Sequence, residues 1–174
     1  AQGDMGNGKS SMIHMLGDLL PKHRKIYFDA TTKDLGDIMI PSMQSIDEDG
    51  CVRMIPNEEL GVHLDGPIIL MLDEIGKANQ AVKNAMLRLI QERQIGSYSL
   101  HPDSIVFATT NKGSEGVGDM LQPHSRNRMI VVQIKKTDHM DWIEWGINNE
   151  VDHSLLGWVK DNPHLMASFE DVKD

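Results

Sequence analysis

Two uninterrupted apolar runs mark the interior of this chain. Residues 68–72 read Ile-Ile-Leu-Met-Leu, and residues 105–110 read Ile-Val-Phe-Ala-Thr-Thr. Runs without a polar interruption suit strands that are buried on both faces of a parallel sheet. Shorter β-prone runs at 26–28 and 130–134 predict two further strands.

The apolar positions between these runs repeat with a helical period. Residues 11–20 carry an apolar stripe that stops at Pro21, which predicts a helix there. A clearer amphipathic helix begins after Asn79, a good N-cap, and ends near Arg93, and a short hairpin is expected at 95–100. Because helices alternate with strands, the predicted fold class is α/β, a mostly parallel sheet flanked by helices.

The least regular part of the chain is 31–67, where glycines and prolines recur at short intervals. Within it we expect a short strand at 51–55 and a poor helix at 57–64. A segment this long between two strands is uncommon unless it is functional. Nearer the end of the chain, amphipathic stretches at 140–145 and 151–159 predict two short helices of a small additional unit.

The composition narrows the class of protein. Of the 174 residues, 40% are hydrophobic and 25% are charged, as in an ordinary globular domain. No apolar run approaches the roughly 20 residues of a membrane span and the N-terminus has no signal region, so we expect a cytoplasmic protein with no membrane partner.

The single cysteine and the scattered histidines argue against an internal disulfide and a zinc site. A net charge of −9 disfavours binding of nucleic acid by the whole surface, although a local basic pore is compatible with it.

A phosphate-binding motif stands almost at the first residue. Residues 3–10 read Gly-Asp-Met-Gly-Asn-Gly-Lys-Ser and fit G-x-x-x-x-G-K-[ST]. Its glycines let the backbone turn and aim successive N–H groups at phosphate oxygens. Lys9 adds a positive charge and Ser10 a hydroxyl for Mg²⁺. The helix that follows presents its N-terminus to the same anion.

The two buried runs both end in residues that suit phosphate chemistry. Asp73 and Glu74 follow the first run directly, and Asn111 follows the second. Adjacent carboxylates at the end of a buried strand repel each other and are partly desolvated, which stability alone does not explain. Ligands of α/β sheets bind at this carboxyl edge, so we predict that the three side chains meet beside the phosphate loop. The alternatives are a strand that leaves into solvent and an asparagine that serves a turn.

Taken together, these motifs resemble those of AAA+ ATPases, and most closely the MoxR-like branch with its phage and bacterial members. Residues 3–10 are similar to Walker A, 68–74 to Walker B and 109–111 to sensor 1. The order and spacing of the three carry the resemblance, which covers nearly the whole chain. Residues 121–129 resemble the family stretch that ends in an arginine finger.

The resemblance implies an ATPase with ATP and Mg²⁺ as cofactors. The implied nucleotide-binding residues are Gly3, Asp4, Met5, Gly6, Asn7, Gly8, Lys9, Ser10 and Ser11. Lys9 would contact the β- and γ-phosphates, and Ser10 and Asp73 would hold Mg²⁺. Glu74 would polarise the attacking water, with Asn111 orienting it.

The family also implies a homo-oligomeric ring, commonly hexameric, that remodels a protein client. Arg128, the better match, or Arg126 would reach the γ-phosphate of a neighbouring subunit; the alternative for this pair is a solvated basic turn. A von Willebrand A domain partner is a further family expectation. Residues 32–41 are the candidate loop facing a ring pore, because Ile38, Met39 and Ile40 look exposed; the alternative is a connector that packs on the domain.

Two departures from the family pattern predict a fragment. The family places a hydrophobic strand before Walker A, in the middle of the sheet, whereas only Ala1 and Gln2 precede Gly3. No arginine of sensor 2 type is recognisable before Asp174. We therefore expect a nucleotide-binding core at 1–136 that lacks its first strand, and the start of a helical lid at 137–174.

Two other functions fit the same motifs. The first is a DNA-dependent AAA+ motor of helicase or loader type, against which the net charge of −9 argues. The second is a module that binds nucleotide without hydrolysing it. Glu74 and Asn111 argue against this second function, because a binding module needs no carboxylate to activate water.

Overall fold

The computed structural model of this chain describes residues 1–3, 6–44, 50–111 and 129–166. At its centre three parallel strands, β2 (Arg24–Asp29), β5 (Ile68–Asp73) and β8 (Ile105–Ala108), lie in the order β2-β5-β8. All six residues of β5 are buried, as expected for the middle strand of a sheet that is covered on both faces. The predicted strands at 26–28 and 68–72 are confirmed.

The strand predicted at 105–110 is broken at Thr109. The Thr109 N–H donates to Leu72 O at 2.9 Å, and the Thr109 carbonyl accepts from the Ile75 N–H at 3.2 Å. After the break, β9 (Thr110–Asn111) pairs in parallel with β1 (Gln2–Gly3). The chain therefore changes its pairing partner from β5 to β1 at Thr109.

The short strand β1 lies between two neighbours. It pairs with β9 on one side, and on the other the Gln2 N–H donates to Val132 O at 2.8 Å while Gln2 O accepts from the Ile134 N–H at 2.7 Å. The sequence predicted no strand ahead of the phosphate loop, and the two-residue β1 corrects that expectation.

The strand predicted at 130–134 does not form. Within it only Gln133 makes a β-bridge, to Gln2. The neighbouring strand β1 is only two residues long, so the rest of this segment has no strand to pair with. Ile130, at its start, is 91% exposed. The apolar run predicted a strand from composition, but strand formation depends on a neighbour.

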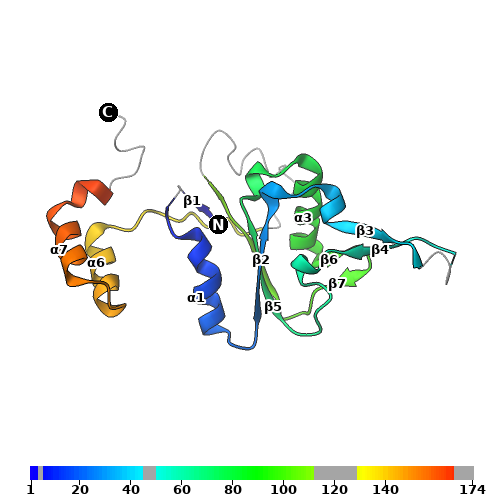
Figure 1. Cartoon of the computed structure of the whole chain (residues 1–174), viewed down its shortest axis with the longest axis horizontal. Helices are drawn as coiled ribbons and strands as arrows, with labels where there is room; N and C mark the ends of the chain where they lie inside the picture. Colours follow the sequence, from blue (N-terminus) through cyan, green and yellow to red (C-terminus); the bar gives the residue numbers. More distant parts are fainter. Residues whose placement is uncertain (4–5, 45–49, 112–128, 167–174) are drawn as a thin grey trace.

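Helices cover both faces of the sheet (Figure 1). On one face α1 (Met12–Leu19) packs Ile13 against Ile69 and Met71 of β5. On the other face α3 (Gln80–Glu92) packs against a larger core that includes Leu70 and Leu72. The buried side chains of α3 are Val82, Met86 and Leu89. Successive side chains of a strand point to opposite faces, so β5 supplies both cores and the fold is α/β.

The start of α3 follows the sequence prediction. Asn79 Oδ1 accepts from the Val82 N–H at 2.9 Å, which satisfies one of the unpaired donors of the first turn. The helix ends at Glu92, close to the predicted end, and its C-cap residue Arg93 is in the left-handed conformation at φ 57°. The predicted hairpin follows as β6 (Gln94–Ile95) and β7 (Tyr98–Ser99).

The irregular segment folds into an antiparallel ladder that projects from the sheet (Figure 1). Strands β3 (Met39–Ser42) and β4 (Arg53–Pro56) form it, so the strand predicted at 51–55 begins two residues later than expected. The prediction of a helix at 57–64 is wrong. Only the 3-10 turn η4 (Glu58–Leu60) forms there, and Gly61 ends this turn at φ 65°.

The candidate pore loop at 32–41 is only partly exposed. Ile38 is 1% exposed and belongs to the main core, and Met39 packs against that core. Ile40 is 58% exposed. The expectation that all three side chains are exposed is therefore wrong, and the connector alternative describes Ile38 and Met39.

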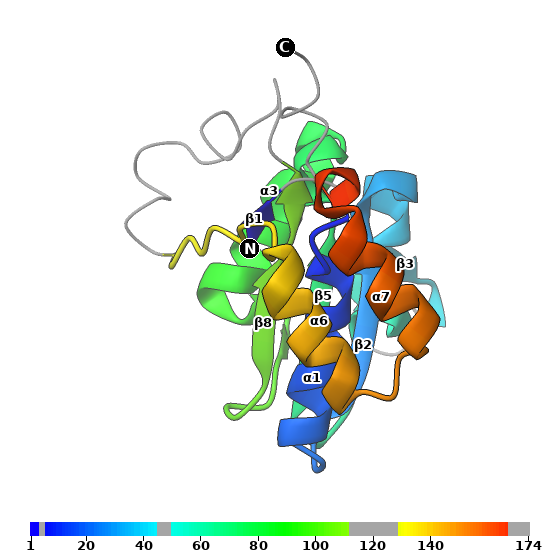
Figure 2. The ribbon, with the colours of Figure 1, turned by 90° about the vertical axis from the view of Figure 1, so that its left-hand side faces the viewer.

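The last described part of the chain is a pair of helices, α6 (His139–Asn148) and α7 (His153–Asp161), on the α1 side of the sheet (Figure 2). Asp138 and Asp152 cap them by accepting from the Met140 and Ser154 N–H groups. Gly146 lets the pair approach closely, because a Cβ there would meet the Leu156 Cδ2 atom at 2.6 Å. Both predicted helices are confirmed. No helix in the described ranges is long and apolar enough to cross a membrane.

Candidate functional site

The phosphate motif, the end of β5 and the end of β9 surround one polar cavity of about 350 Å³. Its lining residues are Gly6, Gly8, Lys9, Ser10, Ser11, Asp73, Glu74 and Asn111. The prediction that Asp73, Glu74 and Asn111 meet beside the loop is confirmed. Gly6 and Gly8 have φ angles of 80° and 71°, a region that residues with a Cβ rarely adopt. A 3-10 turn, η1 (Lys9–Ser11), leads directly into α1, so the cavity lies at the start of a helix.

Lys9 joins the loop to the sheet edge. Its side chain is 7% exposed, and Nζ donates to Gly3 O at 3.0 Å and to Asn111 Oδ1 at 2.6 Å. The residues of the loop that are described do not all face the cavity. The Asn7 side-chain amide donates to Ile134 O at 3.4 Å, and Gly3 lies so close to that carbonyl that a Cβ would approach it at 2.7 Å.

Asn111 bridges Lys9 and Glu74. While Oδ1 accepts from Lys9, the Nδ2 amide donates to Glu74 Oε1 at 2.5 Å. The charges require this orientation of the amide, since the lysine ammonium only donates and the ionised carboxylate only accepts. An amide that carries one donor and one acceptor therefore couples a cation in the loop to an anion at the end of β5.

Glu74 adopts a backbone conformation that is uncommon for a residue with a side chain. Its φ and ψ are 49° and 36°, and its N–H donates to Thr109 Oγ1 at 3.3 Å. Such strain persists where surrounding contacts enforce it, and it clusters at functional sites. The Glu74 Oε2 atom forms an ion pair with Lys77 Nζ at 3.1 Å. Because the lysine side chain is half exposed, this pair contributes little to stability.

The Asp73 carboxylate is buried and held from both sides. Thr109 Oγ1 donates to Oδ1, and the Tyr27 hydroxyl donates to Oδ2 at 2.8 Å. This hydrogen bond, followed by desolvation and the neighbouring negative charges, raises the pKa of Tyr27 to about 12. Tyr27 therefore remains a neutral donor across the physiological range of pH.

Sequence reasoning missed Tyr27, Thr109 and Lys77 as parts of the site. Tyr27 pairs with Met71, two residues before Asp73 and on the same face of the sheet. That relation depends on the register between β2 and β5, which no local pattern reveals. Thr109 lies in the segment that resembles sensor 1, so that resemblance could have identified it. Lys77 follows Glu74 by three residues, and this spacing could have indicated the ion pair.

The donor set fits a magnesium ion. Ser10 offers a hydroxyl and Asp73 a carboxylate, and both line the same cavity. Mg²⁺ takes hard oxygen ligands and is usually held by one or two carboxylates together with water and substrate phosphates. Four residues predicted for the site, Asp4, Met5, Arg126 and Arg128, lie outside the described residues.

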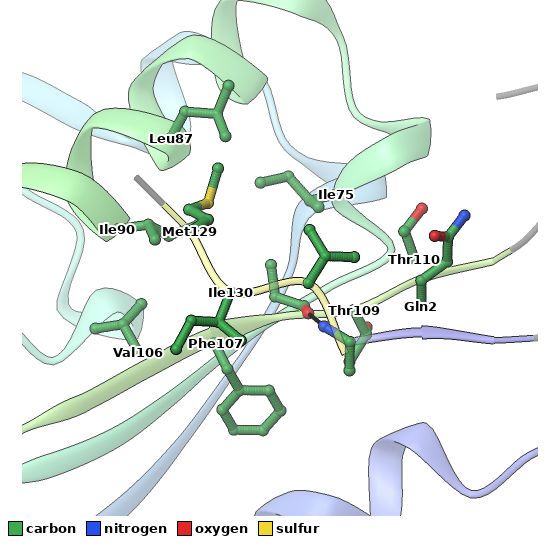
Figure 3. Close-up of a pocket in the computed structure, with 13 residues that line it drawn as sticks. Gln2, Ile75, Leu87, Ile90, Val106, Phe107, Thr109, Thr110, Met129 and Ile130 are labelled. Atoms are coloured by element: carbon green, nitrogen blue, oxygen red, sulfur yellow. Dashed lines mark hydrogen bonds between the residues drawn. The ribbon is translucent and has the colours of Figure 1, made fainter. Parts of the chain in front are cut away.

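A second cavity of about 360 Å³ lies between α3 and β8 and has a different character. Figure 3 shows Leu87 and Ile90 of α3 gathered with Ile75 and Met129 above the sheet, while Phe107 points to the opposite face. Among the residues that the structure describes, no charged side chain lines this cavity. Lys9, Asp73 and Glu74, which can bind charged groups or transfer protons, converge instead on the cavity at the phosphate motif, so that cavity is the better candidate.

Comparison with models of known protein families finds no match, and comparison with curated protein sequences finds none either.

Proposed function

We propose that this chain binds ATP with Mg²⁺ and hydrolyses it, as the nucleotide-binding core of a P-loop ATPase of the AAA+ class. The observation that carries the proposal is the hydrogen-bonded series Lys9–Asn111–Glu74 in one polar cavity. A buried lysine, an amide and a strained carboxylate in that arrangement suit phosphoryl transfer, which needs positioning and charge stabilisation more than covalent chemistry.

Binding would use the loop and the helix behind it. The positive φ angles of Gly6 and Gly8 suit a loop whose backbone N–H groups would face an anion, and the start of α1 would add its partial positive charge. Lys9 would move from Asn111 to the phosphates, since its Nζ already faces the cavity. Ser10 and Asp73 would hold Mg²⁺, which neutralises charge on the phosphates when it is bound.

Hydrolysis would use Glu74 and Asn111. Once Lys9 binds phosphate, Asn111 Oδ1 becomes available to a water while its Nδ2 still holds Glu74. The water attacks the γ-phosphorus, its proton passes to the Glu74 carboxylate, and the bond to the β,γ-bridging oxygen breaks to leave ADP and phosphate. A general base of this kind contributes roughly 10²–10⁴-fold to rate.

The wider family features remain proposals that rest on the resemblance. They are a cytoplasmic homo-oligomeric ring, an arginine of one subunit acting at the site of the next, and a protein client or von Willebrand A domain partner. DNA-stimulated turnover would favour the DNA-dependent alternative.

The test separates binding from hydrolysis. We expect Glu74→Gln to bind a fluorescent ATP analogue as tightly as the unmodified chain while steady-state turnover falls roughly 10²–10⁴-fold. Lys9→Ala should lose binding. Glu92→Gln is the matched control, because Glu92 is a glutamate of α3 whose carboxylate pairs with Arg88. Unchanged turnover in Glu74→Gln would contradict the role of Glu74, and binding without any turnover in the unmodified chain would favour a binding module.

A further inference from the structure

We propose that Tyr27 is a positioning residue for the magnesium ion, acting through Asp73. Its hydroxyl fixes the orientation of the Asp73 carboxylate and thereby sets the affinity of the nucleotide-loaded site for the metal. This inference rests on the proposed function, because it concerns the ion that accompanies ATP. Tyr27 itself touches neither nucleotide nor reacting atoms.

The carboxylate is held by the strands on both sides of β5. Tyr27 is on β2 and donates to Oδ2 at 2.8 Å, whereas Thr109 follows β8 and donates to Oδ1. Two donors from opposite sides fix the rotation of the carboxylate about its own axis. Each carboxylate oxygen has two acceptor sites, so each keeps one for a cation or its water ligands.

The hydroxyl of Tyr27 matters more here than the ring. The side chain is 53% exposed, so its ring contributes little burial, and a phenylalanine would occupy the same space. What the tyrosine adds is a hydrogen bond to a buried carboxylate that lines the polar cavity. A surface tyrosine retained only for packing would not need this bond.

Two opposing effects follow from removing the hydroxyl. Without the donor, the negative charge on Asp73 Oδ2 is less compensated, which by itself strengthens attraction to a cation. The carboxylate is then held by Thr109 alone and rotates more easily, which weakens a site for an ion that demands near-ideal octahedral geometry. Loss of groups that orient metal ligands typically lowers metal affinity by 10–100-fold, so the orientation effect outweighs the charge effect.

The experiment compares Tyr27→Phe with Tyr98→Phe, since the chain has only these two tyrosines. Tyr98 lies in the β6–β7 hairpin and packs against the core. Its replacement by phenylalanine removes the same hydroxyl group, but from a position outside the polar cavity. Mn²⁺ serves as the probe, titrated by electron paramagnetic resonance in the presence of saturating ADP. Nucleotide affinity is measured separately in EDTA.

We expect Tyr27→Phe to weaken Mn²⁺ binding roughly 10-fold, with nucleotide affinity in EDTA changed by less than about twofold. Tyr98→Phe should match the unmodified chain in both measurements. Equal or tighter Mn²⁺ binding in Tyr27→Phe would overturn the inference, and so would an equal loss of metal-free nucleotide binding, which would indicate a structural role. Failure of the unmodified chain to bind ADP at all would instead overturn the proposed function, and this inference with it.

Discussion

At the scale of single residues, the site depends on groups that satisfy one another. Lys9, Asn111 and Glu74 form one hydrogen-bonded series, and Thr109 ties the Glu74 backbone to the Asp73 carboxylate. The sequence predicted Lys9, Asp73, Glu74 and Asn111, because each stands in a motif or at the end of an apolar run. It could not predict Tyr27, whose role comes from the register of two strands separated by the whole irregular segment.

Gly8 tests the requirement for a left-handed backbone in the loop. A Cβ at this position meets no atom of the described residues within 4 Å, so Gly8→Ala introduces backbone strain at φ 71° without a clash against them. We expect the free energy of unfolding to fall by about 1–2 kcal/mol, together with weaker nucleotide binding. Chemical denaturation and titration with a fluorescent nucleotide measure the two effects.

Gly36→Ala is the control for this substitution. A Cβ at Gly36 also enters open space, and its φ lies outside the left-handed region. Stability should therefore change by no more than about 0.5 kcal/mol. If both variants lose the same stability, the conformation of Gly8 is not what the loop requires.

At the scale of elements, the local sequence pattern was sufficient to predict a helix or strand whose formation depends on its own residues. The helix after Asn79 carries both its cap and its apolar stripe, and β5 is apolar throughout. Pattern failed where an element depends on distant partners. The run at 130–134 has strand-forming residues but only β1 to pair with, and the break at Thr109 comes from hydrogen bonds to Leu72 and Ile75.

The helical pair α6–α7 offers a prediction about pH. Asp152 caps α7, and the hydrogen bond from the Ser154 N–H lowers the pKa of its carboxyl below the usual 3.8. A lowered pKa means that the ionised cap stabilises the folded helix above pH 3.8 and that this contribution is lost as pH falls through the folded value. We expect Asp152→Ala to lower the thermal midpoint of the pair at neutral pH, and the difference from the unmodified chain to vanish at low pH.

Tryptophan fluorescence reports the unfolding of these two helices, because the chain has three tryptophans and all of them lie in α6 and α7. Asp161→Ala is the matched control at the opposite end of α7, where a negative charge opposes the helix dipole. Its thermal midpoint should stay the same or rise slightly. A loss in Asp152→Ala that persists at low pH would contradict an electrostatic cap.

At the scale of the whole molecule, the ends of the fold carry features that the proposed catalytic cavity does not use. The β3–β4 ladder projects on one side and the α6–α7 pair lies on the other (Figure 1). Exposed apolar side chains occur on both, including Ile40 on the ladder and Trp145 on the helical pair. If the chain assembles as proposed, such exposed apolar surfaces are where neighbouring subunits would pack.

Assembly itself can be tested through hydrolysis. If an arginine of one subunit completes the site of the next, turnover per subunit rises with protein concentration, and Arg128→Ala or Arg126→Ala lowers it by about 10³–10⁵-fold.

A mixture of two inactive variants gives a sharper result. The Arg128→Ala chain keeps an intact cavity, whereas the Glu74→Gln chain keeps its arginine. Mixing the two should therefore restore turnover at interfaces where a Glu74→Gln subunit supplies the arginine to the cavity of an Arg128→Ala subunit. Mixing Lys9→Ala with Glu74→Gln should restore nothing, because neither has a competent cavity. Turnover per subunit that is independent of concentration and unaffected by either arginine would show that each chain hydrolyses ATP alone.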